Sequence, residues 1–471
     1  MRYLATLLFL FSFCLVKGQT SLSQKIKQAY ERLEADPQMA FASASLTVLN
    51  ADNGEVLFSK NGNMGLAPAS SLKTITAATA FFLLGADFTY ETKLAYTGNL
   101  SAAGVLDGDI YILGGGDPSL GSWRFDQTKT EVVLGAWLNA IKNAGIKQIK
   151  GQIIADDHLF GTQIIPDGWI WQDVGNYYGG GASSLSWREN QFDVRMQPGA
   201  KVGDSVQIKG VFPAMPYLQF VNEVRTGKAG SGDQVFAYMT PNSNLIYLRG
   251  TYAIDLNKPV SPAIPDPALD LAYRLADTLK IAGISVANGS SSWRKLQSEK
   301  ISLNPSYRLI HTTRSPNLSA LVYWFNRKSI NLYGENFLKT FAWKKGNPIS
   351  TAAALSLVKD FWQEKLNIDP RSLNIYDGSG LSPANRVTTQ SMARILQFVR
   401  KESWYAPFYE SLPVYNQMKM KSGSIADVLA YAGYHTNTAG QNLVFSFIIN
   451  NYNGSTAGIR QKMFKVLDEL K

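Results

Sequence analysis

The stretch that decides the fold is Ala67-Pro68-Ala69-Ser70-Ser71-Leu72-Lys73, and a strongly apolar run follows it. It contains the pattern Ser-x-x-Lys. On a helix, residues i and i+3 share a face, so the side chains of Ser70 and Lys73 can meet. Pro68 would fix the entry to this helix, and Gly85 stands where a helix would end. Because the helix is apolar, we expect Lys73 to be buried, which lowers the pKa of a lysine and allows it to act as a base.

Ser-x-x-Lys is a weak pattern by itself. It recurs at Ser292-Trp293-Arg294-Lys295 and at Ser356-Leu357-Val358-Lys359. The first copy lies in a polar, serine-rich turn and the second in a helix of surface type. Ser70 alone begins a strongly apolar helix, predicted over residues 70–84, so Ser70 and Lys73 are the candidate nucleophile and base.

Composition narrows the chemistry further. The 471 residues include one cysteine and three histidines, His158, His311 and His435. None of the histidines belongs to an H-E-x-x-H pattern, no serine lies in G-x-S-x-G, and Gly114-Gly115-Gly116 does not complete a dinucleotide fingerprint. We therefore expect no metal and no cofactor. Serine activated by lysine is the remaining way for such a chain to be a hydrolase.

The N-terminus has the pattern of an export signal. A short basic start precedes an apolar run from Leu4 to Val16, which is shorter than the roughly 20 residues that span a membrane. We expect cleavage near Gly18, which would remove Cys14 and place the protein in the periplasm or cell envelope. A retained membrane anchor is the alternative.

Charge gives little information about partners. Lysine plus arginine number 46 against 36 acidic residues, a net charge of +10, with no long basic run. Basic charge can indicate nucleic acid, but export argues against it. We expect no nucleic-acid partner and at most peripheral contact with a membrane.

The chain is organised as an α/β (α+β) protein whose ends flank a glycine- and strand-rich middle. Strand-like runs cover 45–49, 56–58, 109–113, 429–435 and 442–450. Predicted helices cover 21–34, 70–84, 266–281, 316–326, 332–344, 350–365, 388–402 and 457–470. The simplest architecture is one domain split by a large insertion.

Two further motifs follow the first. Ser329-Ile330-Asn331 is S-x-N, a pattern that Ser302-Leu303-Asn304 and Ser315-Pro316-Asn317 match equally well. Lys421-Ser422-Gly423 occurs once and precedes Ser424. A lysine, a hydroxyl and a glycine on a strand edge suit the recognition of a peptide's terminal carboxylate, because the glycine lets the substrate approach.

The order S-x-x-K, S-x-N, K-[S/T]-G resembles that of the penicillin-recognising serine enzymes. The interval between Ser70 and Ser329 is far longer than in class A β-lactamases. The chain instead resembles the class C low-molecular-mass penicillin-binding proteins, which are D-alanyl-D-alanine carboxypeptidases/endopeptidases of the penicillin-binding protein 4 type. The resemblance covers nearly the whole mature chain and includes residues 67–73, 108–118, 326–335, 377–382, 421–424 and 432–434. Two departures are Ser422, where threonine is usual, and Ile330, where aspartate is common.

The resemblance implies a penicillin-binding/β-lactamase-like transpeptidase domain, an antiparallel sheet flanked by helices. This catalytic domain would comprise residues 19–92 and 303–471. Insertion domain II would comprise 93–190 and 260–302, and insertion domain III 191–259.

The resemblance also assigns roles. Ser70 would attack the terminal D-Ala-D-Ala peptide bond, and Lys73 would take its proton. Ser329 would relay a proton to the leaving amine, while Asn331 would hold Lys73 and the substrate amide. The terminal carboxylate would be bound by Lys421 and Ser422, beside Gly423, and backbone N–H groups of Ser70 and Ser424 would form the oxyanion hole.

The family reads the free amino end of a diaminopimelate stem through an aromatic-acidic stretch in its insertion. Here that stretch resembles Trp169-Ile170-Trp171-Gln172-Asp173, with Tyr177 and Tyr178. Asp173 would pair with the ammonium, and Trp171 and Tyr177 would bind substrate. The alternative is that these residues only pack the insertion. Asp377, in a glycine-rich turn, is expected to be structural.

The implied partners are peptidoglycan stem peptides, with β-lactams acting as inhibitors. Two other functions stay open at this point. A β-lactamase would need fast deacylation, for which no residue suggests itself. A non-catalytic wall-binding protein would have no need to keep Ser70, Lys73, Ser329, Asn331 and Lys421.

Overall fold

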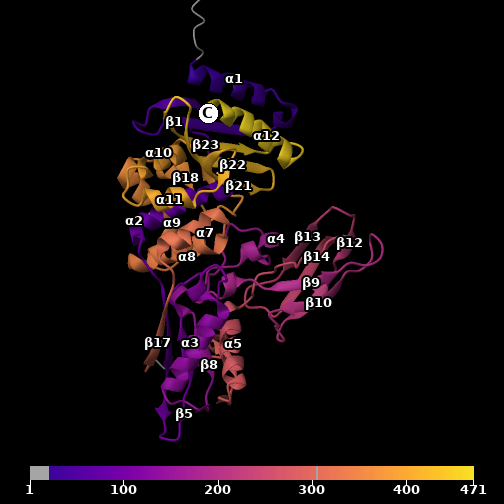
Figure 1. The fold of residues 1–471 in the computed structure, drawn as a ribbon, viewed down its shortest axis with the longest axis vertical. Helices are drawn as coiled ribbons and strands as arrows, with labels where there is room; N and C mark the ends of the chain where they lie inside the picture. Colours follow the sequence, from indigo (N-terminus) through magenta and orange to yellow (C-terminus); the bar gives the residue numbers. More distant parts are fainter. Residues whose placement is uncertain (1–20, 304–305) are drawn as a thin grey trace, which may run out of the picture.

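A computed structural model describes residues 21–303 and 306–471, so the predicted signal peptide, residues 1–18 with Cys14, lies outside the described residues. Within the described ranges, no helix has the length and apolar character needed to cross a membrane. The molecule is elongated (Figure 1). A body of helices and sheet occupies one end, an insertion extends from it, and a strand-rich lobe projects to the side.

The body is built on a six-stranded antiparallel sheet that joins the two ends of the chain. Its strands, in spatial order, are β2 (Val56–Lys60), β1 (Ser43–Asn50), β23 (Asn442–Asn450), β22 (Val428–Thr436), β21 (Met418–Ile425) and β20 (Val414–Tyr415). Most residues of the central strands are buried, because helices cover both faces of the sheet. The predicted strands at 429–435 and 442–450 are present.

Two helix layers enclose this sheet. The terminal helices α1 (Leu22–Glu34) and α12 (Thr456–Leu467) pack on one face, and their buried side chains share a core with alternate residues of the strands. On the other face a larger core joins six helices (Figure 1). These are α2 (Lys73–Leu84), α7 (Leu318–Arg327), α8 (Asn331–Lys344), α9 (Thr351–Leu366), α10 (Thr389–Val399) and α11 (Tyr405–Ser411).

The predicted helix over 70–84 differs from the observed one at its start. Residues Ala69–Leu72 form a 3₁₀ helix, and α2 begins at Lys73. Every α2 residue up to Phe81 is buried, and the helix ends where Gly85 adopts a φ of 88°. Ser70 therefore lies in a tight turn leading into a buried helix. This arrangement aims its side chain toward Lys73.

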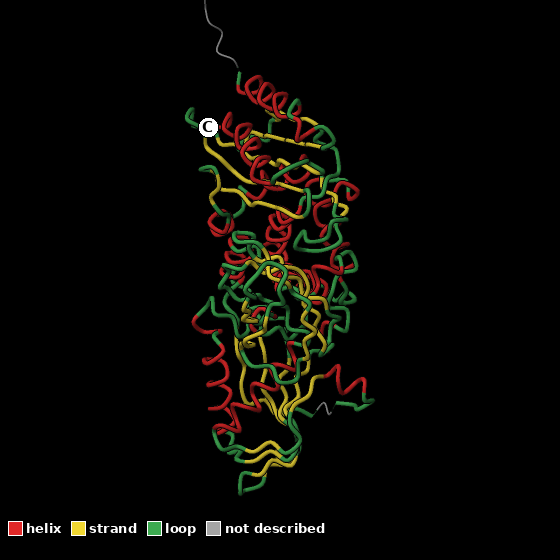
Figure 2. The backbone as a smooth tube through the Cα atoms, turned by 90° about the vertical axis from the view of Figure 1, so that its right-hand side faces the viewer, coloured by secondary structure: helices red, strands yellow, loops and turns green. Residues whose placement is uncertain are grey.

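The insertion leaves the body through β3 (Glu91–Tyr96) and returns through β17 (Arg308–Arg314), which pair antiparallel. Its two sheets have the strand orders β16-β8-β6-β3-β17 and β15-β7-β5-β4. Figure 2 shows strands running through the lower half of the molecule, away from the body. The remaining strands are β4 (Asn99–Leu100), β5 (Val105–Asp107), β6 (Ile110–Leu113), β7 (Gln148–Ile149), β8 (Ile153–Asp156), β15 (Ser285–Val286) and β16 (Ser290–Ser292). The predicted helix at 266–281 is α5 (Pro267–Ile281), capped by Asp266. The strand-rich middle also contains α3 (Thr130–Asn143), which the sequence did not indicate.

The projecting lobe has its own hydrophobic core. Its strands are β9 (Asp193–Gln197), β10 (Gln207–Phe212), β11 (Gln219–Asn222), β12 (Arg225–Gly227), β13 (Asp233–Tyr238) and β14 (Leu245–Ala253). One face of β13 and β14 packs into that core through residues such as Val235, Ala237 and Ile246. The short helix α4 (Trp171–Val174) lies against β13, between the lobe and the body (Figure 1). The residue limits expected for the three parts stay a prediction.

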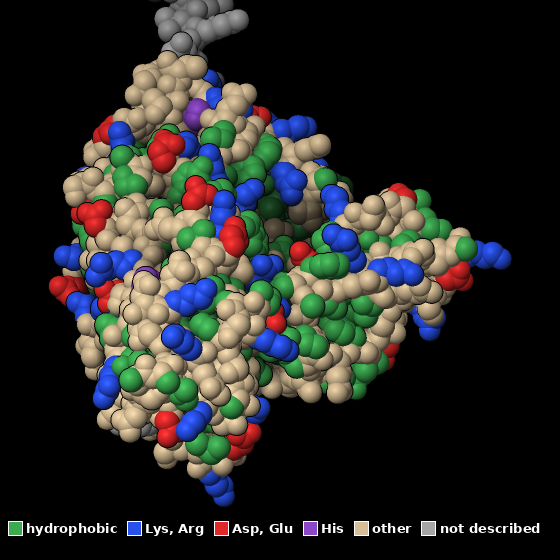
Figure 3. Space-filling view, turned by 60° about the horizontal axis from the view of Figure 1, so that its bottom comes forward, with side chains coloured by type: hydrophobic (Ala, Val, Ile, Leu, Met, Phe, Trp, Pro, Cys, Tyr) green, Lys and Arg blue, Asp and Glu red, His purple; other side chains and the backbone are tan. Residues whose placement is uncertain are grey.

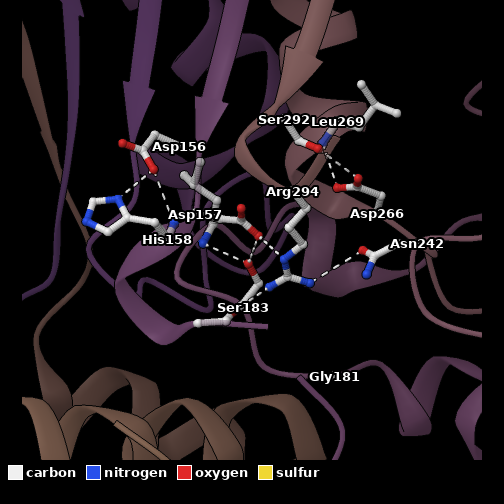
Figure 4. A network of polar contacts seen from close by, with 12 residues as sticks. Asp156, Asp157, His158, Gly181, Ser183, Asn242, Asp266, Leu269, Ser292 and Arg294 are labelled. Atoms are coloured by element: carbon white, nitrogen blue, oxygen red, sulfur yellow. Dashed lines mark hydrogen bonds and ion pairs between the residues drawn. The ribbon is translucent and has the colours of Figure 1, made fainter. Parts of the chain in front are cut away.

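A buried polar network ties the insertion together (Figure 4). Arg294, on α6 (Trp293–Ser298), lies with its Nε 3.0 Å from Oδ2 of Asp157. Ser183 donates to the same carboxylate at 3.0 Å, and Ser292 donates to Asp266, the cap of α5. Ser292, the serine of the Ser-x-x-Lys copy at 292–295, also caps α6 by accepting from the backbone N–H of Lys295, so a helix begins inside the stretch expected to be a turn.

Candidate active site

Lys73 is the centre of the candidate site. Its ammonium lies 2.9 Å from Oγ of Ser70, 2.6 Å from Oδ1 of Asn331 and 2.7 Å from the carbonyl oxygen of Ser379. The side chain is fully buried. Its three partners come from the turn before α2, the start of α8 and the glycine-rich turn at 377–380. The structure therefore brings Ser70, Lys73 and Asn331 together as the sequence predicts.

The electrostatics of Lys73 favour its neutral form. Burial lowers its pKa from the usual value to about 7, although the carboxyls of Asp377 and Glu335 act in the opposite direction. All three hydrogen-bond partners are neutral oxygens. Among the residues that the structure describes, Lys73 forms no ion pair within 4.0 Å. A lysine in this state can accept the proton of a serine hydroxyl near neutral pH.

Ser329 and Asn331 lie where α7 gives way to α8. Ser329 has a φ of 58°, which is uncommon for a residue other than glycine and marks a constrained turn. Asn331 is the first residue of α8. Its Oδ1 accepts from Lys73, and its Nδ2 donates to the carbonyl oxygen of Tyr178 at 2.8 Å. The side chain of Asn331 therefore connects the lysine to the insertion.

Strand β21 passes close to the turn that carries Ser70. A Cβ on Gly423 would lie 2.5 Å from the carbonyl oxygen of Pro68 and 2.8 Å from the backbone nitrogen of Ser70. Glycine is needed here because any side chain would push the strand away from the nucleophile. Ala69, just before Ser70, has a φ of 44°, which is uncommon for a residue other than glycine. The backbone is therefore constrained in the turn of Ser70 as well as at Gly423.

Lys421 lies on β21 with 1% of its surface exposed, and its Nζ donates to the carbonyl oxygen of Ser422 at 2.8 Å. Burial, and then the charge of Lys73, lower the pKa of Lys421 well below its usual range. Strand β20 pairs with β21 only at Met418 and Lys419. The N–H of Met420 donates to the carbonyl oxygen of Pro413, and beyond that bond the edge of β21 has no strand partner among the described residues, which leaves it for a substrate backbone.

A cavity of about 610 Å³ opens beside Ser70. Its walls come from the body, from α4 and the residues that follow it, and from β13 of the lobe. Figure 3 shows the surface hollowed where the lobe meets the body. The lining residues are Ser70, Ile170, Gln172, Asp173, Tyr177, Tyr178, Phe236, Lys328, Ser329, Asn331, Leu381, Pro383, Ser424, Ile425 and Ala426.

The cavity sorts the sequence-predicted residues into three groups. Catalytic and insertion residues meet in one space, since Ser70, Ser329, Asn331, Ser424, Asp173 and Tyr177 all line it. Four predicted residues are not part of the lining. Lys73 lies at the start of α2, behind Ser70, and the other three follow one another on β21: Lys421, Ser422 and Gly423. Trp171 is not part of the lining; it is 52% exposed and its ring lies 6.2 Å from that of Tyr238.

Asp173 is partly buried on α4. Burial raises the pKa of its carboxyl, while a hydrogen bond from the Tyr178 hydroxyl acts in the opposite direction. The Tyr177 and Tyr178 rings meet edge to face at 5.3 Å. The carboxyl thus stands in an aromatic surrounding on the wall that also carries the partner of Asn331. Asp173 supplies the one carboxylate among the residues that line the cavity, so a cationic group entering there would pair with it.

Glu335, which no motif predicts as a site residue, supports the site from the buried side of α8. It lies one turn after Asn331 on α8, and both of its carboxyl oxygens accept from the backbone N–H of Gly378, at 3.1 and 3.0 Å. Burial, and then the charge of Asp377, raise the pKa of Glu335 to about 8. The i, i+4 spacing from Asn331 was the available signal, because it places both side chains on one helix face.

Asp377 fills the structural role expected for it. Its carboxylate accepts from the backbone N–H groups of Gly380 and Ser382, at 2.8 and 2.6 Å, and from the side chains of Trp169 and Asn385 at 2.9 Å each. These four bonds shape the turn whose Ser379 carbonyl accepts from Lys73. In the described chain, none of the three histidines lines the cavity.

Comparisons with known proteins agree with this geometry. Residues 26–470 match the D-Ala-D-Ala carboxypeptidase 3 (S13) family. The chain is 24% identical over 465 residues to a D-alanyl-D-alanine carboxypeptidase of Actinomadura sp. (strain R39), covering 91% of this chain and 82% of that one. It is 25% identical over 435 residues to the D-alanyl-D-alanine carboxypeptidase DacB of Haemophilus influenzae, covering 88% and 86%.

The fold has a solved counterpart. The crystal structure of penicillin binding protein 4 (dacB) from Haemophilus influenzae superposes with a TM-score of 0.78 at 21% identity, covering 94% of this chain and 97% of that chain. The mixed α/β fold with a large insertion is therefore confirmed. The chain belongs to the D-Ala-D-Ala carboxypeptidase 3 (S13) family of serine peptidases, as its motifs indicate.

Proposed function

We propose that this S13-family chain is an exported DD-peptidase that cleaves the terminal D-Ala-D-Ala bond of peptidoglycan stem peptides through an acyl-enzyme on Ser70. The observation that carries the proposal is the 2.9 Å contact between Lys73 Nζ and Ser70 Oγ, made by a buried lysine without an ion-pair partner among the described residues. A serine with that neighbour has its base in place.

In the acylation step, Ser70 Oγ attacks the carbonyl carbon of the scissile bond while its proton moves to Lys73. The C–N bond then breaks, and Ser329 relays the proton from Lys73 to the leaving D-alanine amine, which returns Lys73 to its neutral form. Asn331 holds the lysine during this exchange, because its Oδ1 lies 2.6 Å from Nζ. Water then hydrolyses the ester and releases the shortened peptide and free Ser70.

The open edge of β21 orients the substrate. The peptide backbone lies along this edge, its terminal carboxylate meets Lys421 and Ser422, and Gly423 leaves room for it. Backbone N–H groups of Ser70 and Ser424 receive the oxyanion. Ser424 is exposed and lines the cavity beside Ser70, which supports this assignment.

The insertion binds the side chain of the stem peptide. Asp173 is the acidic group for a free ammonium, with Tyr177 as an aromatic neighbour in the same cavity. If the ammonium belongs to a diaminopimelate residue, the same site accommodates D-Ala-diaminopimelate cross-links, and the protein is then also an endopeptidase. β-Lactams acylate Ser70 as substrate mimics and act as inhibitors. These steps take place in the periplasm or cell envelope, after signal-peptide cleavage near Gly18.

The first experiment tests the nucleophile. Ser70→Ala should abolish covalent labelling by a fluorescent penicillin while the melting temperature stays close to that of the native protein. Ser356→Ala is the matched control, because Ser356 heads another Ser-x-x-Lys pattern but is exposed on α9. Labelling that survives Ser70→Ala, or that is lost in Ser356→Ala, would overturn the assignment.

The second experiment identifies the reaction. Mass spectrometry of muropeptides after incubation should show loss of one D-alanine, and cleavage of cross-linked dimers if the endopeptidase activity is present. Sustained turnover of a chromogenic cephalosporin would indicate a β-lactamase instead. If neither substrate is turned over, the protein is a wall-binding protein.

A third experiment tests Asp173. Asp173→Asn should lower the rate of cleavage of peptides with a free side-chain amine and leave the rate on amine-blocked peptides unchanged. Equal rates on the two peptides would remove Asp173 from the site.

A further inference from the structure

The solvent-facing side of the lobe sheet beside the cavity is aromatic, where a sheet with one buried face normally carries polar side chains. Phe236 and Tyr238 are two residues apart on β13, so they share that face. Their neighbours Val235 and Ala237 point into the lobe core. Tyr247 of β14 stands directly opposite Tyr238.

This aromatic face continues onto α4. The exposed ring of Trp171 lies 6.2 Å from that of Tyr238. A hydrogen bond beside this ring contact holds β13 against α4. In it, the backbone N–H of Ala237 donates to the side-chain Oδ1 of Asn176, just after α4, at 3.2 Å. We call Phe236, Tyr238, Tyr247 and Trp171 the aromatic strip. Phe236 lines the cavity of Ser70, so the strip starts inside the site and runs out across the lobe.

A charged pair borders the strip. The guanidinium of Arg249 lies 5.4 Å from the ring centroids of both Tyr238 and Tyr247. Its Nε is 2.6 Å from Oε2 of Glu223, and both side chains are about half exposed. Flat apolar rings beside a donor and an acceptor suit a ligand with apolar C–H faces and a rim of hydroxyl and amide groups. That is the chemistry of a saccharide.

We propose that the aromatic strip binds the saccharide backbone from which the stem peptide hangs. The inference rests on the proposed function, since a stem peptide with its D-alanine end at Ser70 must leave the cavity by its sugar-bearing end. Continuity of the strip with the cavity argues for this occupant, because Trp171 is exposed and the other three rings are partly exposed, and an apolar patch left open to solvent beside a cavity marks a ligand-binding surface. Trp171 then serves the sugar rather than the peptide.

The test compares substrates with and without sugar. The variants are Trp171→Ala and the double variant Tyr238→Thr/Tyr247→Thr, in which threonine keeps the preference for a strand. On a stem peptide linked to an oligosaccharide, each should raise KM by about 5- to 10-fold with kcat unchanged. On the free stem peptide the double variant should keep both constants at native values. Phe41→Ala is the control, since Phe41 is 77% exposed in the body, away from the cavity.

Binding of peptide-free glycan strands, followed by tryptophan fluorescence, separates the two proposals. Saturable binding that Tyr238→Thr/Tyr247→Thr weakens supports the strip even if no peptide is cleaved, so failure of the proposed function is visible on its own. Intact hydrolysis of free peptide, together with equal KM values for both substrates or no glycan binding, would overturn the inference. A change of sedimentation coefficient in the variants without glycan binding would identify the strip as a contact between two copies of the chain, which also overturns it.

Discussion

Two deeply buried cations of this molecule are held in opposite ways. Arg294, in the insertion, is 8% exposed and lies 3.0 Å from the carboxylate of Asp157, which Ser183 also contacts (Figure 4). Lys73, in the body, is fully buried and contacts a hydroxyl, an amide oxygen and a carbonyl oxygen. One cation has a counter-charge, and the other has neutral oxygens alone as direct partners.

The difference separates a structural charge from a reactive one. A guanidinium stays charged, so its burial requires a partner, and the pair links the residue that follows β8 to α6. An amine can lose its proton, and burial among neutral acceptors lowers the pKa of Lys73 to about 7. Lys421 follows the same rule, with a pKa well below its usual range. In both lysines of the candidate site, burial therefore disfavours the charged form.

Exchanging the two cation types should have the largest effect at Lys73. Lys73→Arg places a group that cannot act as a base beside Ser70, so the rate of acylation by penicillin should fall about a thousandfold or more. Stopped-flow measurement of the labelled adduct gives this rate. Lys73→Met, which has a similar length and no base, should show the same loss. Acylation within tenfold of the native rate in both variants would contradict the role of Lys73, by the same scale of general-base effects.

Removing the structural cation should act on stability instead. Arg294→Met leaves Asp157 buried without its partner, so the free energy of unfolding should fall by about 3 kcal/mol. Urea denaturation followed by fluorescence measures this change, and the acylation rate should stay near its native value. Arg371→Met is the control, since Arg371 pairs with Asp369 in full exposure and should change stability little. If Arg294→Met slowed acylation more than it lowered stability, Arg294 would not be the structural cation of the pair.

The pH dependence of acylation should follow the protonation of Lys73. Below its pKa of about 7 the lysine is charged and cannot accept a proton, so the rate should fall roughly tenfold for each pH unit. Above that value the neutral amine predominates, and the rate should level off. Measuring the second-order rate of penicillin acylation across this range gives the profile. A rate that keeps rising past pH 9 would assign Lys73 an ordinary pKa near that of an exposed lysine.

The smallest effect is expected at Glu335. With a pKa of about 8 this carboxyl is protonated at neutral pH, so Glu335→Gln should keep acylation within a few-fold of the native rate at pH 7. Because the protonated carboxyl carries no charge below pH 7, Glu335→Gln should also leave the acid limb of the profile in place. A shift of that limb to lower pH would show that Glu335 is charged in the native protein and raises the pKa of Lys73, which would contradict its assignment as a neutral group.

Sequence was informative where a motif has local geometry. Ser70 and Lys73 meet across one turn, so their contact depends on neighbours in the chain. The K-S-G motif could be recognised as a pattern, but the contact that requires its glycine is with the distant turn at Pro68 and Ser70. Contacts between distant segments carried no such signal. The bond from Asn331 to the carbonyl of Tyr178 joins residues 153 positions apart, and Phe236 reaches the cavity only because the lobe folds back.

Irregular backbone conformations near the site could not be predicted from the sequence either. The 3₁₀ turn around Ser70 and the positive φ of Ala69 and Ser329 are conformations that their residue types do not favour, so tertiary packing must impose them. Helix α11 escaped prediction because Pro407 and three aromatic residues obscure its period. Figure 1 shows it packed among the other helices of the body, where burial overrides its weak local preference.

The central claim is that burial among neutral oxygens lowers the pKa of Lys73 to about 7, so that a large share of it is a neutral base at physiological pH. Its most direct test is an NMR titration of the native protein labelled with ¹³C at lysine Cε, with the Lys73 signal assigned by its absence in Lys73→Arg. The account predicts that this signal titrates near pH 7. A midpoint above pH 9, in the ordinary range for lysine, would contradict it.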